Sequence, residues 1–460
     1  YFDLVAEAIA MRGLRSTLVL LVITVSMGAY IYFVERHRPP SSDPEPNEQL
    51  FNFEENDLSS LRVTSEDGGI TTLERTDEMW RITTPVDTAA DEATASSIAS
   101  TLASLEVRRV IEESPINFEP FGLDEPTLDL GFSLNESDTT QHLLVGEETP
   151  TGADRYAKIS DTDRVFLIAS YLNSTFNKTT FDLRDKTILR FQQEDLDRLD
   201  IATADKTIRF EKVVNEWELA EPWRARTDLS TVQSLLQSLS SGQMLSVELE
   251  ETDELKAFGL ADPGYTVDAH AGNATVTLHI GDKTSDGAHY AQDTSRGLVF
   301  TIDASLVTSL DRNPSEYRSK DLFQFSPFNA NRLEIEQDTA TTVFEKIDPQ
   351  TEDGEESWQR VEPEPADVEH AEMDDLLMKL SNLRAESFVT SRAEANLEPA
   401  NIAMTIRVRF GDGNEEEHVT IWKADDEIFA VHGDESGAAQ IDPSIFDDAI
   451  TALETTETGN

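Results

Sequence analysis

The densest group of side chains that could do chemistry is the run FGDGNEEEH at residues 410–418. It brings together Asp412, Glu415, Glu416, Glu417 and His418. Carboxylate oxygens are the ligands that calcium prefers, and a calcium loop places them at alternating positions. This run lacks that alternation. The sequence therefore favours a hairpin turn with a solvated acidic side over a metal site.

Two glycine-containing segments could form a ligand-binding loop, FGLDEP at 121–126 and FGLADP at 258–263. A phosphate-binding loop needs several glycines followed by Lys and then Ser or Thr. Each segment has one glycine and no such Lys. We expect each to be a turn that leads the chain from a helix to a strand.

The sequence offers no recognisable catalytic constellation. The eight His residues are scattered, and no G-x-S-x-G nucleophile motif occurs. The absence of cysteine excludes thiolate metal sites, cysteine nucleophiles and disulfides. With 90 acidic residues in the chain, two neighbouring carboxylates carry little information about acid–base catalysis. We therefore assign no catalytic, cofactor-binding or metal-ligating residue, expect no cofactor, and predict a protein that is not an enzyme.

Basic residues recur at matching positions in LRDKTILRF at 183–191 and YRSKDLFQF at 317–325. The two segments align Arg184 with Arg318 and Lys186 with Lys320. These bases could pair with acids of the adjoining module and fix the angle between modules, or they could form a docking strip for an acidic partner. We favour the first interpretation.

The elements that would position these residues form an internal repeat. Trp80, Trp217 and Trp358 are each followed five positions later by a proline, at Pro85, Pro222 and Pro363, and the successive Trp residues are 137 and 141 positions apart. Before each Trp, two alternating segments separated by a polar turn predict a hairpin. The Trp segment adds a third strand, which the proline ends.

A helix follows each third strand, and its apolar residues recur at the spacing of one helical face. These residues are Ala95, Ile98, Leu102 and Leu105 in the first copy, Val232, Leu235, Leu239 and Gly242 in the second, and Met373, Leu376, Leu380 and Leu383 in the third. Asp228 and Ser230 are candidate N-caps of the second helix. Further alternating strands and a short terminal helix near Leu172, Leu306 and Phe446 complete each copy. The predicted fold class is α+β, with three repeated modules, each an antiparallel sheet packed by one main helix.

Residues 17–34 carry no charge over 18 positions, which is near the lower limit for spanning a bilayer. We predict a transmembrane anchor here, preceded by a cytoplasmic leader at 1–16 in which Met11 is the expected start. A Pro-rich acidic linker follows at 35–56. The predicted modules are 57–193, 194–328 and 329–454, with a tail at 455–460.

The net charge of -53 would repel nucleic acid and anionic lipid headgroups. The flanking arginines are balanced across the apolar segment and do not set its orientation, but the short N-terminal side favours a cytoplasmic N-terminus. We therefore expect a single-pass membrane protein with the bulk of the chain outside the cytoplasm.

The leader MRGLRSTLVLLVITVSMGAYIYFVE, the repeated Trp–Pro spacing, the FGL turns and the RDK boundary together resemble the bacterial domain-of-unknown-function 4340 family. The resemblance implies a membrane-anchored protein encoded beside ATPase and permease components of ABC transporters related to gliding motility. It supplies no catalytic residues. We expect a non-enzymatic accessory subunit with a partner such as an ABC permease or auxiliary subunit. The alternatives are an enzyme acting on envelope polymer through an inter-module carboxylate site, and a sensor of a small ligand or cation.

Overall fold

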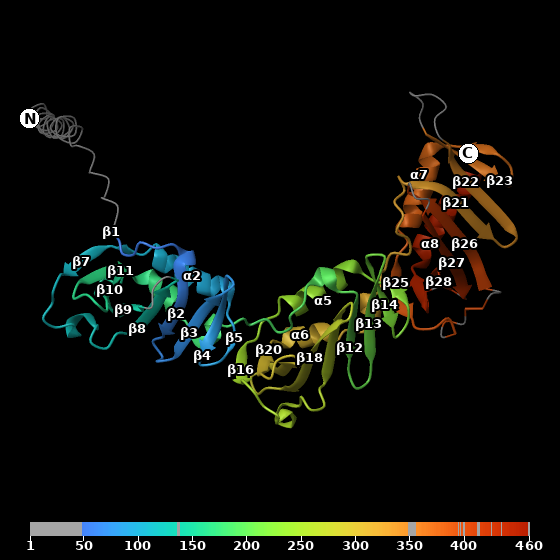
Figure 1. Cartoon of the computed structure of the whole chain (residues 1–460). Coiled ribbons are helices and arrows are strands. Elements are labelled where there is room, and N and C mark those ends of the chain that lie inside the picture. Colours follow the sequence, from blue (N-terminus) through green and yellow to red (C-terminus); the bar gives the residue numbers. More distant parts are fainter. Residues whose placement is uncertain are drawn as a thin grey trace, which may run out of the picture. The chain divides into compact units, whose positions relative to one another are not determined.

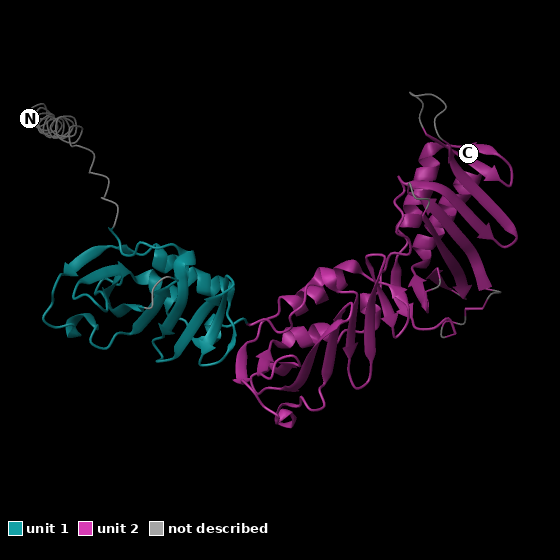
Figure 2. Ribbon diagram, in the orientation of Figure 1, with its two compact units in different colours: residues 1–185 teal, residues 186–460 magenta. Residues whose placement is uncertain are grey.

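The computed structural model describes residues 48–458, apart from 136–138, 348–355, 394, 396, 399–400, 412–414, 425 and 434. The expected anchor at 17–34, its leader and most of the linker lie outside the described residues. Within the described part, no helix is both long and apolar enough to cross a membrane. The chain divides into two compact units, residues 1–185 and residues 186–460 (Figure 2).

The described residues form three nine-stranded antiparallel sheets with one strand order, so the predicted repeat of antiparallel sheets is confirmed (Figure 1). The first sheet contains β2 (Leu58–Thr64), β3 (Ile70–Thr76), β4 (Met79–Thr84), β5 (Thr88–Ala89), β7 (Arg109–Glu112), β8 (Leu128–Leu134), β9 (Gln141–Glu148), β10 (Asp154–Ile159) and β11 (Val165–Ala169). A separate pair joins β1 (Glu48–Gln49) to β6 (Glu106–Val107).

The second sheet contains β12 (Arg198–Ala202), β13 (Thr207–Val213), β14 (Glu216–Glu221), β15 (Ala225–Arg226), β16 (Ser246–Leu249), β17 (Tyr265–Ala271), β18 (Ala274–Lys283), β19 (His289–Asp293) and β20 (Val299–Ile302). The third contains β21 (Ala330–Gln337), β22 (Ala340–Ile347), β23 (Ser357–Glu362), β24 (Ala366–Val368), β25 (Ala385–Val389), β26 (Ile402–Phe410), β27 (Glu415–Ala424), β28 (Glu427–His432) and β29 (Ala438–Ile441). In each sheet, the first long strand joins the N-terminal meander to the C-terminal one.

The helices follow the same repeat. They are α2 (Glu92–Ala103), α3 (Asn173–Phe176) and α4 (Thr180–Leu183) in the first unit, and α5 (Leu229–Ser240), α6 (Ala304–Leu310), α7 (His370–Ser381) and α8 (Pro443–Thr458) in the second. The terminal helix near Phe446 is not short as predicted: α8 has 16 residues and packs into the third core beside α7. The main helices α2, α5 and α7 bury the apolar faces that their spacing predicts, but the last predicted members, Leu105, Gly242 and Leu383, lie beyond the helix ends, and Gly242 is only partly buried. Asp228 caps α5 by accepting the Thr231 backbone N–H, whereas Ser230 lies inside the helix, so its predicted capping role is wrong.

The three repeated tryptophans are buried, with exposed fractions of 2%, 8% and 3% for Trp80, Trp217 and Trp358. Trp80 lies among the core residues of the first sheet and Trp358 among those of the third. Each third strand ends immediately before its proline, as predicted. What the sequence missed is the short edge strand that follows, because β5, β15 and β24 have only two or three residues. The chain therefore adds one more strand to the sheet before it enters the helix.

Candidate functional site

The two FGL segments are turns, as predicted. In each, a short 3₁₀ helix ends at a glycine in the left-handed conformation, Gly122 with φ 66° and Gly259 with φ 68°. A second glycine on the neighbouring strand lets the turn approach closely. A Cβ atom at Gly281 would lie 2.1 Å from the Phe258 carbonyl oxygen, and one at Gly146 would lie 2.2 Å from that of Phe121. The glycines are explained by this packing and need no bound phosphate.

The acidic run at 410–418 is only partly the solvated turn that we expected. Asp412 lies outside the described residues, and Glu415 and Glu416 are exposed at the start of β27. Glu417 is 7% exposed, and both of its carboxylate oxygens accept the Gln324 backbone N–H, at 2.9 and 3.1 Å. Burial raises the pKa of Glu417. The prediction of a wholly solvated acidic side is therefore wrong at Glu417. Among the described residues, no cluster of His, Asp or Glu could hold a metal ion.

The boundary bases behave differently from one another. Arg318 is 4% exposed, and its Nη2 atom lies 3.0 Å from Glu435 Oε2, on the turn between β28 and β29. This confirms for Arg318 the expected pairing with an acid of the adjoining module. Lys320 contributes its backbone, because its carbonyl accepts the Ala385 N–H at 2.7 Å. In the first unit, the aligned Arg184 is likewise buried and forms a backbone bridge with Ala90.

Glu435 is the centre of a largely buried ionic cluster that joins the second and third sheets within the second unit. Its Oε1 atom accepts both the backbone N–H and the Nε–H of Arg226, each at 3.0 Å, while its Oε2 atom accepts from Arg318. The Nη2 atom of Arg226 donates to the carbonyl oxygens of Asp321 and Leu322, at 2.8 and 3.1 Å. Three segments that are distant in the sequence are thereby held together. We call Arg226, Arg318 and Glu435 the junction cluster.

The surroundings of the junction cluster determine its charge. Burial lowers the pKa of Arg318, and the neighbouring Glu435 carboxylate acts in the opposite direction. The Arg318 guanidinium also lies 4.2 Å from the centre of the Phe388 ring, a distance at which a cation and an aromatic ring attract. Burial and then the Arg226 charge lower the pKa of His432 to about 4, so this imidazole is neutral at pH 7. One carboxylate thus serves two guanidinium groups in a protected environment.

A cavity of about 490 Å³ opens beside the junction cluster. Its lining includes Trp217, Glu218, Arg224, Arg226 and Glu435. The charged groups of this wall are largely paired, since Arg224 Nη2 lies 2.8 Å from Glu218 Oε2. The arrangement is suited to holding two sheets together. Its charged side chains could also take part in recognising a ligand. A hydrogen-bonded nucleophile and base are not found among its described lining residues.

The aligned boundary segments pointed to Arg318, but nothing in the sequence identified Glu435 or Arg226 as the residues it meets. Arg226 and Glu435 are 209 positions apart and belong to different sheets, so no local pattern links them. Glu435 follows another acid, Asp434, in a chain with 90 acidic residues, and nothing in its type or spacing distinguishes it. The only available signal was the alignment of Arg184 with Arg318, which pointed to the boundary without naming the acid.

Comparison with known proteins gives one informative result. The model of a family described as a domain of unknown function, DUF4340, matches residues 80–218 and again residues 217–402. Each match begins at a repeated tryptophan, and together the matches cover more than half of the chain. Neither the curated proteins nor the solved structures provide a match. The two matches repeat at the period of the sheets, each from the third strand of one sheet into the next sheet, and the chain belongs to the DUF4340 family.

Proposed function

We propose that this chain is a non-enzymatic accessory subunit that binds a partner protein of a membrane complex. The observation that carries the proposal is the junction cluster, because it ties one repeated sheet to the next through buried side chains. Arrays of this kind are built from nearest-neighbour contacts and offer long surfaces for binding. The sequence of residues 17–34 adds the proposed anchor, which places the array at the bacterial cytoplasmic membrane and outside the cytoplasm.

The nature of the partner follows from charge and from the resemblance. A net charge of -53 disfavours nucleic acid and anionic lipid surfaces, and leaves a protein with basic exposed segments as the favoured partner. The proposed link to an ABC-type transport or gliding-motility-like complex rests on the family resemblance alone. A permease or auxiliary subunit of such a complex would lie within reach of a membrane-anchored chain.

The enzymatic alternative would use carboxylates between modules, and the second unit contains two candidates there. Glu417 has the raised pKa that such a role requires, but the Gln324 backbone N–H occupies both of its oxygens. Glu435 holds Arg226 and Arg318. Both carboxylates are therefore engaged in structural contacts, which favours the accessory role. The sensor alternative has one observation in its favour, the cavity beside Glu435.

The test is a purification of the tagged full chain from membranes of its own host after mild crosslinking. A control chain that carries residues 1–56 without the sheets separates partners of the anchor from partners of the repeated array. We expect a membrane-complex protein to be enriched by the full chain alone. An identical set of proteins with both chains, or hydrolysis of envelope polymer by the purified chain, would contradict the proposal.

A further inference from the structure

The segment that leaves the first sheet lies against that sheet's outer edge, next to β5. Asp91 donates its backbone N–H to the Leu183 carbonyl at 2.7 Å, and Asp185 donates to the Ala89 carbonyl at 3.0 Å. These two hydrogen bonds are an antiparallel exchange across the sheet edge. The edge strand, which would otherwise present unpaired backbone groups, is thus covered by the chain's own extended segment.

The second sheet repeats this exchange at the equivalent positions. Asp228 donates its backbone N–H to the Tyr317 carbonyl at 2.8 Å, and Ser319 donates to the Arg226 carbonyl at 2.9 Å. The donor on the edge follows the repeated Trp by eleven positions in both sheets, and the acceptor follows it by nine. In both cases the residue between the two bonded positions of the covering segment is a buried arginine, Arg184 or Arg318.

The third sheet has the same edge but no covering segment among the residues that the structure describes. Counting from Trp358 places the donor at Glu369 and the acceptor at Asp367. Outside the β23–β24 pairing, neither the Glu369 N–H nor the Asp367 carbonyl has a hydrogen-bond partner in the described part of the chain, and both residues are exposed. Asp367 pairs with Gln359 as Arg226 pairs with Glu218, so its carbonyl has the outward orientation in which Arg226 accepts from Ser319. The helix α8 continues instead toward β22 and β23. There the Glu457 side chain accepts a hydrogen bond from the Thr342 hydroxyl, and the Glu457 carbonyl accepts one from Arg360.

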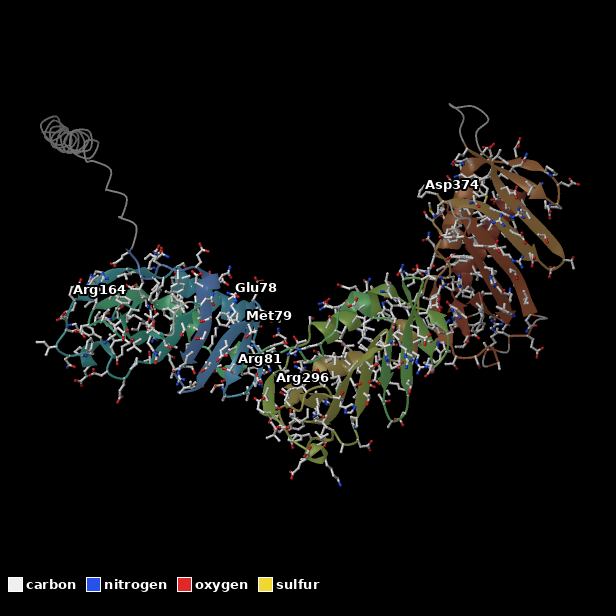
Figure 3. The ribbon with its side chains drawn as sticks, viewed as in Figure 1. Glu78, Met79, Arg81, Arg164, Arg296 and Asp374 are labelled. Atoms are coloured by element: carbon white, nitrogen blue, oxygen red, sulfur yellow. The ribbon has the colours of Figure 1, made fainter. Side chains whose placement is uncertain are left out.

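The charge around this open edge favours one class of occupant. The segment VEPEPADVEHAE at 361–372 contains no Lys or Arg, and its acids Glu362, Glu364, Asp367 and Glu369 are exposed. Asp374, in the helix α7 that follows this edge, adds another acid (Figure 3). An extended segment with basic side chains would gain attraction from these carboxylates as well as two backbone hydrogen bonds.

We propose that the edge strand β24 binds an extended, basic segment of a partner protein by the two-bond exchange seen at β5 and β15. This deepens the proposed function and rests on it for the existence of a protein partner. A second copy of this chain fits poorly, because the sequence before the first sheet, DPEPN at 43–47, is acidic and carries two prolines. The occupant is therefore another protein, and its binding strand carries Arg or Lys.

The probe is a fluorescent peptide, Lys-Tyr-Arg-Ser-Lys-Arg, which keeps the Tyr-Arg-Ser order of residues 317–319. Its binding to the detergent-solubilised full chain is followed by fluorescence polarisation. Glu369 has φ -63° and ψ 130° and makes no side-chain cap, so Glu369→Pro fits the backbone and removes only the donor N–H and one charge. Glu369→Ala is the matched control, because it removes the same charge and keeps the N–H.

We expect Glu369→Pro to weaken peptide binding by about fivefold to tenfold relative to Glu369→Ala, the effect of losing one backbone hydrogen bond. A peptide N-methylated at its serine should lose a similar factor against the wild-type chain. Circular dichroism checks that α7 is intact in both variants. Equal binding by the two variants would overturn the proposal, since charge attraction alone would then explain it.

Two other results would also overturn it. One is the absence of binding by the peptide, and the other is a concentration-dependent dimer of the full chain that Glu369→Pro abolishes, which would make a second copy the occupant. The proposed accessory function would survive either result if the membrane purification still yields a partner. Failure of that purification with intact peptide binding would instead count against the proposed function alone.

Discussion

The second and third sheets carry the same turn, between β19 and β20 and between β28 and β29, but use it differently. In the second sheet, Arg296 donates from Nη2 to the carbonyl oxygens of Thr187 and Ile188, at 2.8 and 2.9 Å (Figure 3). Asp293, three positions earlier at the end of β19, lies with its carboxylate 2.9 Å from the Arg296 Nε atom. The carbonyl groups of the preceding segment are thus bound by a local brace.

In the third sheet, the position of Arg296 is taken by Glu435 and that of Asp293 by His432. The matching carbonyls, of Asp321 and Leu322, are again bound by a guanidinium, but this one belongs to Arg226 of the second sheet. At one turn position a base of the second sheet is matched by an acid of the third, and the matching carbonyl groups are bound by Arg296 of the same turn in one case and by Arg226 of the neighbouring sheet in the other. Repeats of the same fold can therefore keep the same backbone contacts with side chains from different places.

The largest expected effect comes from Glu435→Ala, which breaks the connection. Removing one partner of a buried ion pair leaves an uncompensated charge, and here two guanidinium groups lose their carboxylate. We expect a loss of about 3–5 kcal/mol in the free energy of unfolding. Hydrogen exchange measured by mass spectrometry on the full chain should show faster exchange at both β15 and the β28–β29 turn.

Asp293→Ala is the matched variant for the local brace. It should accelerate exchange at the β19–β20 turn and the segment from Thr187 to Leu189, while β24 to β29 remain protected. If Glu435→Ala accelerated exchange in the third sheet alone, the junction cluster would not couple the second and third sheets.

His432 provides the next largest effect, because its folded pKa of about 4 lies below the ordinary value of 6.5. The unfolded chain binds this proton first, so the contribution of His432 is fully present above about pH 6.5 and is lost as the pH falls toward 4. Relative to His432→Gln, the wild-type chain should lose about 2–3 kcal/mol over that range. Urea unfolding at several pH values measures the difference and cancels titrations that both chains share.

The groups that face His432 are Arg226, Glu435 and His418, and burial is the largest cause of its lowered pKa. In the second sheet Asp293 stands at this position, so no imidazole titrates there. Parallel pH profiles for the wild-type chain and His432→Gln would show that the imidazole has the same pKa in the folded junction as in the unfolded chain.

A third difference between these sheets is steric. Gly281 of the second sheet is matched by Trp422 in the third, where the FGL turn is missing. A Cβ at Gly281 would meet the Phe258 carbonyl oxygen at 2.1 Å, so Gly281→Ala should destabilise the chain by about 1–3 kcal/mol. Gly264→Ala is the control, since its Cβ would have its nearest neighbour at 3.7 Å. Equal midpoints for both variants in thermal unfolding would remove the steric explanation.

The sequence predicted the parts of this architecture that depend on local periodicity. The strand IAMTIRVRF at 402–410 alternates in burial as its sequence does, and the faces of α2, α5 and α7 follow the helical spacing. The edge strands β5, β15 and β24 were missed because two or three residues are too few to show a period. Glu417 was misread because alternation along β27 turns one acid of a continuous acidic run into the interior. The junction cluster could not be predicted, since its members meet only through tertiary packing.

The smallest expected effect tests whether burial, and not distance, decides the strength of an ion pair at this junction. Arg384 Nε lies 2.8 Å from Asp321 Oδ1, slightly closer than Arg226 Nε lies to Glu435 Oε1. The Arg384 and Asp321 side chains are 60% and 54% exposed, whereas those of Arg226 and Glu435 are each 15% exposed. Water screens the exposed charges, so Arg384→Ala should cost only about 0–1 kcal/mol.

This small effect should shrink further in salt, because the Debye length falls from about 10 Å at 0.1 M to about 3 Å at 1 M. The effect of Glu435→Ala should change much less, since the Arg226 and Glu435 side chains are only 15% exposed and salt screens a largely buried pair weakly. Urea unfolding of both variants at the two salt concentrations makes the comparison. Equal losses for Arg384→Ala and Glu435→Ala would mean that contact distance alone sets the energy. The burial of the junction cluster would then not explain how the second and third sheets are coupled.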